Sequence, residues 1–566
     1  MDGNDAALEL ERLAKAEEAA WVKRLPADPA QRFACFVTAT RAVDYFAFLR
    51  PRTGPDFVAR ELLNAGWNVL TAMLFADPGA TPVMPIFRST EAHFEWAVAA
   101  MRTLGGCAMA RRVAPMLRAG VLVAEDRDVE LIVRMAPGLE LGHLRDRAEN
   151  VELARLGSER ASGRVVAALR DDIDDLMRPL IHPWRAGEIV IAGYDARSEV
   201  DEHFLALASP LVLDLCDSAG IHPKAAIGGV AAESFIAVCG LVVSFQMKHA
   251  RFCSLLDRHP EIGLRESLTI WKPRSLTVET VCAITGFAPE VVGAALNCIA
   301  MTSGDVPRLG AHISPFRPPL IDCGNGIDLW PVSSLTRNPF VEARILQQWR
   351  DPKGTSALVA PREEWLREEL YALFMGTRYR CTPGAVDLKK GGNTVTDLDA
   401  AVFDVTTGEL ALFQIKWQDF ATHDFRELSS RAKNFAASVD AWAGAVSAWI
   451  EERGLDALQR CLRLKLVKGQ AITSVRLFAL TRQHSRFQAW ASVLDRPDLA
   501  IANWAQFVLL RQRLGPAEHV IDLLHASVRE EAKAPPPPYD TLGRTCELSG
   551  RAVRFADFWQ AAPDTQ

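Results

Sequence analysis

The apolar and polar positions divide the chain into a largely helical first half and a second half in which helices and strands alternate. Apolar residues recur at helical spacing in residues 34–49 and 92–104, which is the pattern of amphipathic helices. Alternating apolar residues on both sides of a charged turn in residues 121–135 predict a β-hairpin. From residue 139 to about residue 253 the spacing is again that of helices.

The second half has the pattern of an α/β domain. Residues 361–374 predict a helix that ends before Gly376, since glycine suits a helix end. After a loop at residues 387–396, two apolar segments predict a β-hairpin, residues 396–405 and 410–417. Further along, the same patterns predict a helix at residues 425–450, strands at 474–482 and 500–504, and a helix at 507–514.

These patterns predict four segments. They are a mostly helical region, a helix pair with a proline-rich connector, an α/β domain, and a proline-rich linker with a hairpin tail, over residues 1–270, 271–350, 351–533 and 534–566. The boundary at residue 351 rests on the turn-forming run Asp351–Ser356. The linker rests on the prolines at 535–538, which exclude a helix. The expected fold class is therefore an α/β domain, with a central mixed sheet flanked by helices, after a large mostly α region.

Residues 275–301 have the pattern of two short helices joined by a turn at Thr285–Phe287. A helix pair of this kind can read DNA, but the second helix then needs Arg, Lys, Asn or Gln side chains. Residues 289–300 contain only Asn297 from this set. Two interpretations follow: a structural helix pair, which the composition favours, or a helix-turn-helix regulator.

Composition and charge limit the classes of function. The net charge of −6 excludes a strongly basic protein that coats nucleic acid, although residues 351–566 are electrically balanced. The apolar run 225–247 is interrupted by Glu233, whereas a membrane span needs about 20 apolar residues. The eleven cysteines include no Cys-x-x-Cys pair. We therefore expect reduced thiols, a cytoplasmic location and no membrane.

The predicted hairpin of the α/β domain brings three polar side chains together. We assume a four-residue turn in which Val405 pairs with Leu410. Asp399 then lies opposite Lys416, and Gln414 lies on the same face because side chains alternate along a strand. Such a group in an apolar sheet is costly unless its members are paired or bind something. The pattern indicates either a cross-strand ion pair on a solvated face or a binding site.

The order of these residues resembles the PD-(D/E)xK nuclease superfamily, and most closely its Mrr-type branch. Members carry an acidic residue at the start of one strand and an acid-x-Lys motif on the next, with Gln in place of the acid in the Mrr-type branch. Asp399 and the run Gln414-Ile415-Lys416 match this pattern over residues 357–524. The chain differs in having Leu398 rather than proline before Asp399. The resemblance implies a restriction-endonuclease-like fold for this domain.

The resemblance also implies a ligand set and a metal ion. Superfamily members often carry a glutamate on the preceding helix, for which Glu364 is the best match and Glu368, one turn on, the rival. Asp399, Gln414 and Glu364 would then hold Mg²⁺ or Mn²⁺ through oxygen atoms. Lys416 would hold the attacking water and offset charge on the phosphate. Basic residues that could contact nucleic acid are Lys389, Lys390, Arg426 and Lys433.

The function that the resemblance implies is a divalent-metal-dependent endonuclease. It would hydrolyse phosphodiester bonds in nucleic acid, with DNA as the first expectation and restriction or defence as the setting. Two alternatives use the same fold differently. One is a catalytically inactive member that binds nucleic acid, and the other is a scaffold whose N-terminal helices bind a protein partner. The helix-turn-helix regulator is a third.

Overall fold

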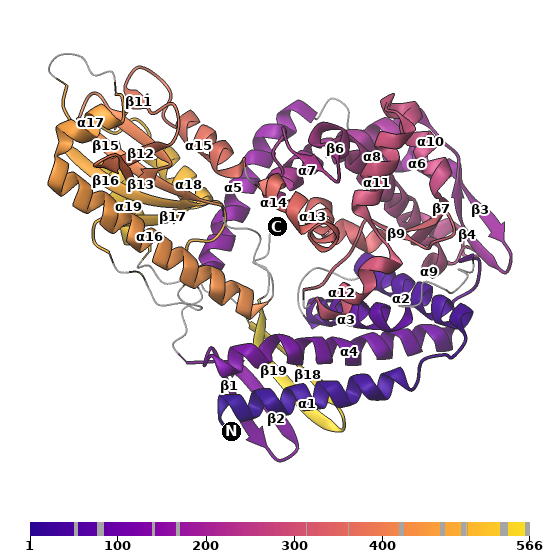
Figure 1. Ribbon diagram of the computed structural model, residues 1–566. Helices are drawn as coiled ribbons and strands as arrows, with labels where there is room; N and C mark the ends of the chain where they lie inside the picture. The colour runs from indigo at the N-terminus through magenta and orange to yellow at the C-terminus, as the bar shows by residue number, and fades with distance from the viewer. Residues whose placement is uncertain are drawn as a thin grey trace. The chain divides into compact units, whose positions relative to one another are not determined.

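A computed structural model describes the chain at residues 1–49, 55–75, 84–137, 142–165, 170–312, 314–359, 361–417, 424–464, 470–487, 494, 496–532 and 541–560. The chain divides into two compact units, and neither is one continuous stretch of sequence (Figure 1). Unit 1 comprises Met1–Pro137, Ala161–Val359 and Tyr539–Gln566, and unit 2 comprises Gly138–Arg160 and Ala360–Pro538. Both units contain helices and sheets, so the fold class is mixed α/β.

This division differs from the four predicted segments. The C-terminal hairpin groups with unit 1, because its strands complete a sheet there, and residues 138–160 group with unit 2. The division falls after Val359, a few residues beyond the predicted boundary at Asp351–Ser356, because Pro352 begins helix α14 there. Proline at a first helical turn does not break a helix, which explains the difference. The prolines at 535–538 lie outside the described residues.

Unit 1 is mostly helical. Its α-helices are α1 (Gly3–Val22), α2 (Pro29–Leu49), α3 (Pro55–Leu74), α4 (Glu91–Arg118), α6 (Ile173–Met177), α7 (Ser198–Ala219), α8 (Ala232–Ser254), α9 (Leu264–Ser267), α10 (Arg274–Thr285), α11 (Pro289–Ile299), α12 (Val306–Ala311), α13 (Pro339–Arg350) and α14 (Pro352–Val359). The helical spacing at residues 34–49 and 92–104 falls within α2 and α4, so both predictions are confirmed.

The strands of unit 1 form small sheets. They are β1 (Leu122–Arg127), β2 (Glu130–Met135), β3 (Ile181–Ala186), β4 (Ile189–Tyr194), β5 (Ala226–Ile227), β6 (Val230–Ala231), β7 (Thr269–Pro273), β8 (Ala300–Met301), β9 (Leu320–Asp322), β10 (Ile327–Pro331), β18 (Thr541–Leu548) and β19 (Arg551–Gln560). The hairpin predicted at residues 121–135 is confirmed as β1–β2. The prediction of helices throughout residues 139–253 is wrong at β3–β4, where Gly187 at φ 59° permits a two-residue turn.

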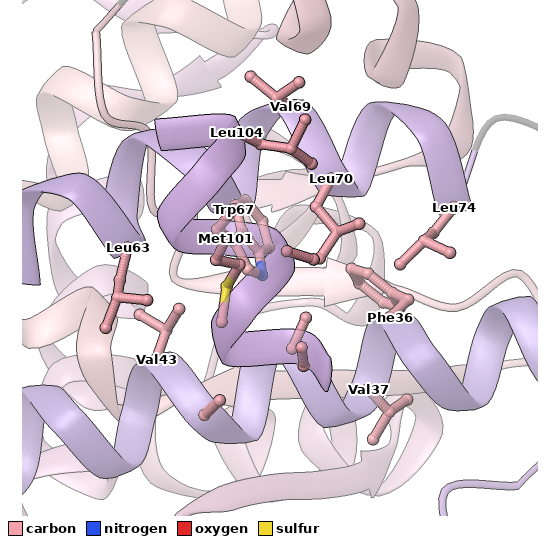
Figure 2. Close-up of a cluster of buried hydrophobic side chains, with 14 of the residues drawn as sticks. Phe36, Val37, Val43, Leu63, Trp67, Val69, Leu70, Leu74, Met101 and Leu104 are labelled. Carbon is pink, nitrogen blue, oxygen red and sulfur yellow. The ribbon is translucent and has the colours of Figure 1, made fainter. Parts of the chain in front are cut away.

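A large apolar cluster of unit 1 lies among α2, α3 and α4. Figure 2 shows Phe36, Trp67, Leu70 and Met101 directed into the space between these helices, and each is at most 1% exposed. The helices approach closely at Gly66 and Gly105, where a Cβ atom would overlap the facing backbone. Glycine at these positions permits the close packing that buries the large side chains.

The helix pair predicted at residues 275–301 is formed by α10 and α11, which meet at 118°. The second helix buries Val292, Ala295 and Leu296 in the core of unit 1. Asn297 accepts a hydrogen bond from Arg274, so its amide is already engaged. The burial agrees with a structural helix pair. No single helix in the described part of the chain has the length and apolar composition to cross a membrane, although this bent pair meets that criterion when taken together.

Unit 2 is built on a five-stranded mixed sheet in the order β11-β14-β15-β16-β17. Its strands are β11 (Tyr379–Cys381), β14 (Ala400–Asp404), β15 (Glu409–Lys416), β16 (Ser474–Thr481) and β17 (Leu499–Asn503), and β12 (Val386–Lys390) pairs with β13 (Asn393–Leu398) in a separate hairpin. β11, β14 and β15 are antiparallel, whereas β16 and β17 add in parallel to β15. The predicted strands at residues 474–482 and 500–504 are confirmed as β16 and β17.

Helices cover both faces of this sheet. They are α15 (Arg362–Ala372), α16 (Phe425–Arg453), α17 (Leu455–Cys461), α18 (Trp504–Leu514) and α19 (Val520–Glu531), together with most of α5 (Gly142–Val165). Buried side chains of α15, α18 and α19 pack on the face that carries Phe413 and Ile415. The long helix α16, orange in Figure 1, packs with α17 on the face that carries Leu410 and Leu412. Unit 2 is therefore a three-layer domain with a mixed sheet in the middle.

The core of unit 2 predicts a large cost for truncating Phe413. This side chain is fully buried and stacks on Phe478, with ring centroids 5.1 Å apart. Phe413→Ala should lower the free energy of unfolding of unit 2 by about 3–5 kcal/mol, since it leaves a cavity. Leu523→Ala, on the same unit at a side chain that is 43% exposed, should change it by less than about 0.5 kcal/mol. Urea midpoints of unit 2 peptides, measured by pulsed hydrogen exchange, test both, and equal shifts would contradict this packing.

Candidate active site at the carboxyl edge of the unit 2 sheet

The candidate site lies where the strand predicted at residues 396–405 is divided into β13 and β14. Asp399 lies between β13 and β14, at the point where the chain stops pairing with β12 and starts pairing with β15. The loop predicted at residues 387–396 is therefore corrected to a hairpin. Its turn is possible because Gly391 and Gly392 adopt φ of 57° and 89°. Asp399 thus occupies the break at which the strand changes partners.

The predicted register of β14 against β15 is wrong by two residues. Phe403, rather than Val405, lies opposite Leu410. The strand ends earlier because the buried Asp404 accepts hydrogen bonds from Arg378 and from the backbone N of Thr406, which starts the turn there. An even shift leaves every side chain on the face predicted for it. Asp399 consequently lies beside Gln414 instead of Lys416.

Asp399 makes hydrogen bonds to β15 just before β14 begins. Its Oδ2 accepts from the backbone N of Ile415 at 2.7 Å and from Nε2 of Gln414. Its own backbone N donates to Phe413 O at 3.0 Å. Asp399 is 8% exposed and Gln414 is 4% exposed. Among the described residues Oδ1 of Asp399 has no hydrogen-bond partner, so it is available to a ligand.

Lys416 and a helix glutamate complete the group. Nζ of Lys416 lies 3.8 Å from Oε1 of Glu363, with side chains that are 30% and 48% exposed. Lys416 also interacts electrostatically with Asp399. Glu363 stands in the first turn of α15, directly before the sheet in sequence. The structure therefore brings together Asp399, Gln414 and Lys416, as predicted, and adds Glu363 from the preceding helix.

The predicted helix glutamate differs by one residue from the one in the structure. Successive helical residues are turned by about 100°, so Glu364 projects in a different direction from Glu363. Exposure does not separate the candidates, since Glu363, Glu364 and Glu368 are all exposed. A signal for the correct residue exists in the sequence. Glu363 precedes the buried Leu366 and Leu370 by three and seven residues, the spacing that places residues on one helix face.

Burial and like charge raise the pKa values of both carboxyls. Burial is the main cause for Asp399, and it outweighs the hydrogen bond from Ile415 and the attraction of Lys416. Partial burial is also the main cause for Glu363, where Lys416 opposes the shift while Asp399 and Asp397 add to it. Three carboxylates thus act on one another here, while Lys416 and Arg367 oppose the shift at Glu363.

The residues present fit a hard divalent cation. Asp399 and Glu363 offer carboxylate oxygens, and Gln414 offers the amide oxygen that its bond to Asp399 leaves over. Mg²⁺ is commonly held by one or two carboxylates, with waters and substrate phosphates as the remaining ligands. In the described part of the chain, no three His, Cys, Asp or Glu side chains are grouped to hold a metal by themselves. A metal here would therefore rely on water, the amide and the substrate.

The basic residues predicted to contact nucleic acid fall into two pairs. Arg426 and Lys433 are exposed on the first half of α16. Lys389 and Lys390 lie on β12 and already form ion pairs, with Asp387 at 3.6 Å and with Glu452 at 2.8 Å. The first pair is thus the better candidate for a phosphate contact.

Two arginines beside the site were not among the predicted site residues. Arg367 Nη1 donates to the backbone O of Asp399 at 3.3 Å. Arg482 follows the end of β16, where its backbone N donates to Lys416 O at 3.3 Å, and its guanidinium lies 5.2 Å from the ring centroid of Trp417. A helical spacing of four residues from Glu363 could have indicated Arg367. The position of Arg482 depends on parallel pairing between β15 and β16, which no local pattern specifies.

Comparisons of the chain with protein-family models, with curated protein sequences and with solved structures each found no match.

The raised pKa of Asp399 predicts how the stability of unit 2 depends on pH. The folded state binds this proton more tightly than the unfolded state does, so the free energy of unfolding falls as pH rises from the ordinary pKa of 3.8 through the raised value. Asp399→Asn should therefore gain stability relative to wild type as pH rises through that window. Urea midpoints of β15 peptides, followed by pulsed hydrogen exchange across the window, measure the difference.

The control for this measurement is Asp498→Asn. The hydrogen bond from Arg496 lowers the pKa of Asp498, so its ionised form stabilises the fold. This variant should lose stability relative to wild type as pH rises from the lowered value to the ordinary pKa of 3.8, a window that lies below the one for Asp399. Slopes of the same sign for both variants would contradict the electrostatics described for Asp399.

Proposed function

We propose that the chain is a divalent-metal-dependent nuclease that hydrolyses phosphodiester bonds, with DNA as substrate. The observation that carries the proposal is the grouping of Asp399, Gln414, Lys416 and Glu363 at one edge of the unit 2 sheet. Two carboxylates, an amide and a lysine are the groups that metal-assisted hydrolysis of a phosphodiester needs.

The arrangement of unit 2 supports the resemblance to the restriction-endonuclease-like fold. A helix, α15, precedes the antiparallel strands β11, β14 and β15, and α16 then leads to β16, which adds in parallel. Asp399 lies at the start of one strand, and the Gln-x-Lys run ends the next. The acidic residue, the motif and the helix glutamate thus occur in the order that the PD-(D/E)xK resemblance implies.

Each residue has a distinct part in the proposed reaction. Asp399 and Glu363 would hold Mg²⁺ or Mn²⁺, which when bound polarises the phosphate and lowers the pKa of water. Gln414 fixes Oδ2 of Asp399 through its amide, and Oδ1 would then serve the metal. Lys416, whose Nζ lies 3.8 Å from Oε1 of Glu363, would hold the attacking water, and its charge would offset that of the pentacoordinate transition state. Water attacks phosphorus and gives up one proton to solvent, the P–O bond to the leaving nucleoside breaks, and the leaving oxygen takes up a proton.

Lys416→Ala should reduce metal-dependent cleavage by about 10²–10³-fold, because one preorganised electrostatic contact in the transition state is lost. The fold should survive, since the Lys416 side chain is 30% exposed and serves no apolar cluster. Nicking of supercoiled plasmid in Mg²⁺ or Mn²⁺, together with melting curves, measures both effects.

The same assay includes a matched pair of helix variants. Glu363→Gln should lower cleavage and weaken the metal response, whereas Glu364→Gln, one residue away and exposed, should leave both within about twofold of wild type. Undiminished cleavage by a folded Lys416→Ala protein would place the chemistry elsewhere. If wild type binds DNA but cleaves nothing with any divalent metal, unit 2 is a binding module.

Gln414→Glu tests the metal-binding part of the site. Without metal, the new carboxylate faces Oδ2 of Asp399 in place of a donor, so the melting temperature should fall. With Mg²⁺ or Mn²⁺ it supplies a third charged ligand, so the metal-induced rise in melting temperature should exceed that of wild type and cleavage should persist or increase. Calorimetric melting with and without metal is the measurement. An identical metal response in wild type and variant would exclude residue 414 from the ligand set.

A further inference from the structure

Helix α5 is held on unit 2 by polar groups instead of by an apolar stripe. Of residues 145–156 in this helix, Asp146 is the one that is buried. Asp146, Glu149, Asn150 and Leu153 follow the spacing of one helix face, and Leu153 is the member of that face that packs against the apolar core of unit 2. A surface helix usually buries several apolar side chains on such a face. The attachment of α5 therefore depends on its carboxylates.

The partners of these carboxylates form a receptacle for anions. Asp146 accepts from the backbone N of Ser485 at 3.0 Å, the backbone N of Arg486 at 3.0 Å, Oγ of Ser485 at 3.1 Å, Nη1 of Arg486 at 2.6 Å and Nδ2 of Asn503 at 2.8 Å. Glu149 accepts from both terminal nitrogens of Arg486 at 2.7 and 2.9 Å and from Nδ2 of Asn503 at 2.7 Å. Asn503 is held in this orientation because its Oδ1 caps α18 through Gln506 N.

This set of donors suits a phosphodiester as well as it suits a carboxylate. Consecutive backbone N–H groups form anion-binding concavities, and an arginine fork donates two parallel hydrogen bonds to carboxylate or phosphate. The Arg486 side chain is 6% exposed and Asp146 is fully buried. The receptacle is thus a built site with fixed donors, and the chain itself supplies the anions that fill it.

The receptacle lies in the same row of the sheet as the proposed catalytic lysine. Lys416 pairs with Thr481 at the end of β16, and Thr481 pairs with Asn503 at the end of β17. Two strand spacings separate Lys416 from Asn503, a distance of about 10 Å. One nucleic-acid strand laid across the carboxyl edge of the sheet would contact both positions, and ligands of α/β sheets bind at this edge.

We infer that Ser485, Arg486 and Asn503 form a phosphate-binding subsite for the nucleic-acid substrate, and that α5 occupies it as an internal competitor. The inference rests on the proposed function, because it names the regulation of the same site. Asp146 and Glu149, which share Arg486 Nη1 and Asn503 Nδ2 as donors, take the place of a substrate phosphate while α5 is docked. Nucleic acid can bind the receptacle only when α5 leaves it. Hydrogen bonds, rather than apolar burial, oppose the departure of α5.

The test compares glutamate-to-glutamine substitutions at two positions of the same helix. Glu149→Gln removes a charge from the receptacle, and Glu152→Gln removes one from the exposed pair that Glu152 forms with Arg155, outside it. The full chain is titrated with fluorescent single-stranded and duplex oligonucleotides in EDTA, so that cleavage cannot occur. We expect Glu149→Gln to bind about tenfold more tightly than wild type, and Glu152→Gln to stay within about twofold.

A second measurement follows the helix directly in the wild-type chain. Hydrogen exchange of peptides from α5 should speed up when the oligonucleotide is added, because α5 is displaced, while peptides from β15 should remain protected. This arm decides the question if Glu149→Gln fails to fold. Unchanged exchange in α5 with oligonucleotide bound would overturn the inference, as would a folded Glu149→Gln protein that binds no more tightly than Glu152→Gln.

These outcomes separate the inference from the proposed function. If wild type cleaves in a Lys416-dependent manner but α5 neither moves nor affects binding, the proposed nuclease function is supported and the role of α5 as a competitor is rejected. If Glu149→Gln binds more tightly and α5 is displaced, but no metal supports cleavage, the subsite stands and the chemistry is wrong.

Discussion

The polar groups at the carboxyl edge of the unit 2 sheet depend on how β14 pairs with β15. The pairing places Ala400 opposite Phe413, and the next residue back, Asp399, still donates its backbone N–H to Phe413 O. Its side chain accepts the Ile415 N–H that the ending strand no longer serves. A shift by one residue would turn Asp399 toward the apolar face that carries Phe413. The register therefore lets Oδ2 of Asp399 accept the Ile415 N–H, and this hydrogen bond also fixes the position of the carboxylate.

The cost of that arrangement is electrostatic. Asp399 is buried, Glu363 is partly buried, and burial raises the pKa of each. A buried carboxylate is retained when it is hydrogen-bonded and faces a positive charge. Lys416 provides that charge from the end of β15, where the side chain can still reach solvent. Lys416 and the hydrogen bonds to Asp399 therefore offset part of the cost of burying the carboxylates.

The path of the chain adds a second constraint. Helix α5 is made from residues 142–165, but its carboxylates meet partners that follow at separations of 339 and 357 residues. The C-terminal hairpin β18–β19 likewise returns to β2 of unit 1. Contacts of such long range are costly to close and form late. Each unit contains segments that are far apart in the sequence, so neither can finish folding until nearly all of the chain is present.

Local patterns in the sequence determined the elements, and the tertiary structure decided what they bring together. Periodicity and turn residues were enough for α2, α4, β1–β2, β16 and β17, because each depends on neighbours within a few positions. Alternation along β15 was enough to place Gln414 and Lys416 on one face, even though the predicted register was two residues off. The choice of Glu363 over Glu364 required the packing of α15 on the sheet. The places of Arg482 and Asp146 required strand pairings and contacts across hundreds of residues. The physical reason is that a side chain's face follows from local geometry, whereas its partner follows from chain closure, which no short stretch of sequence encodes.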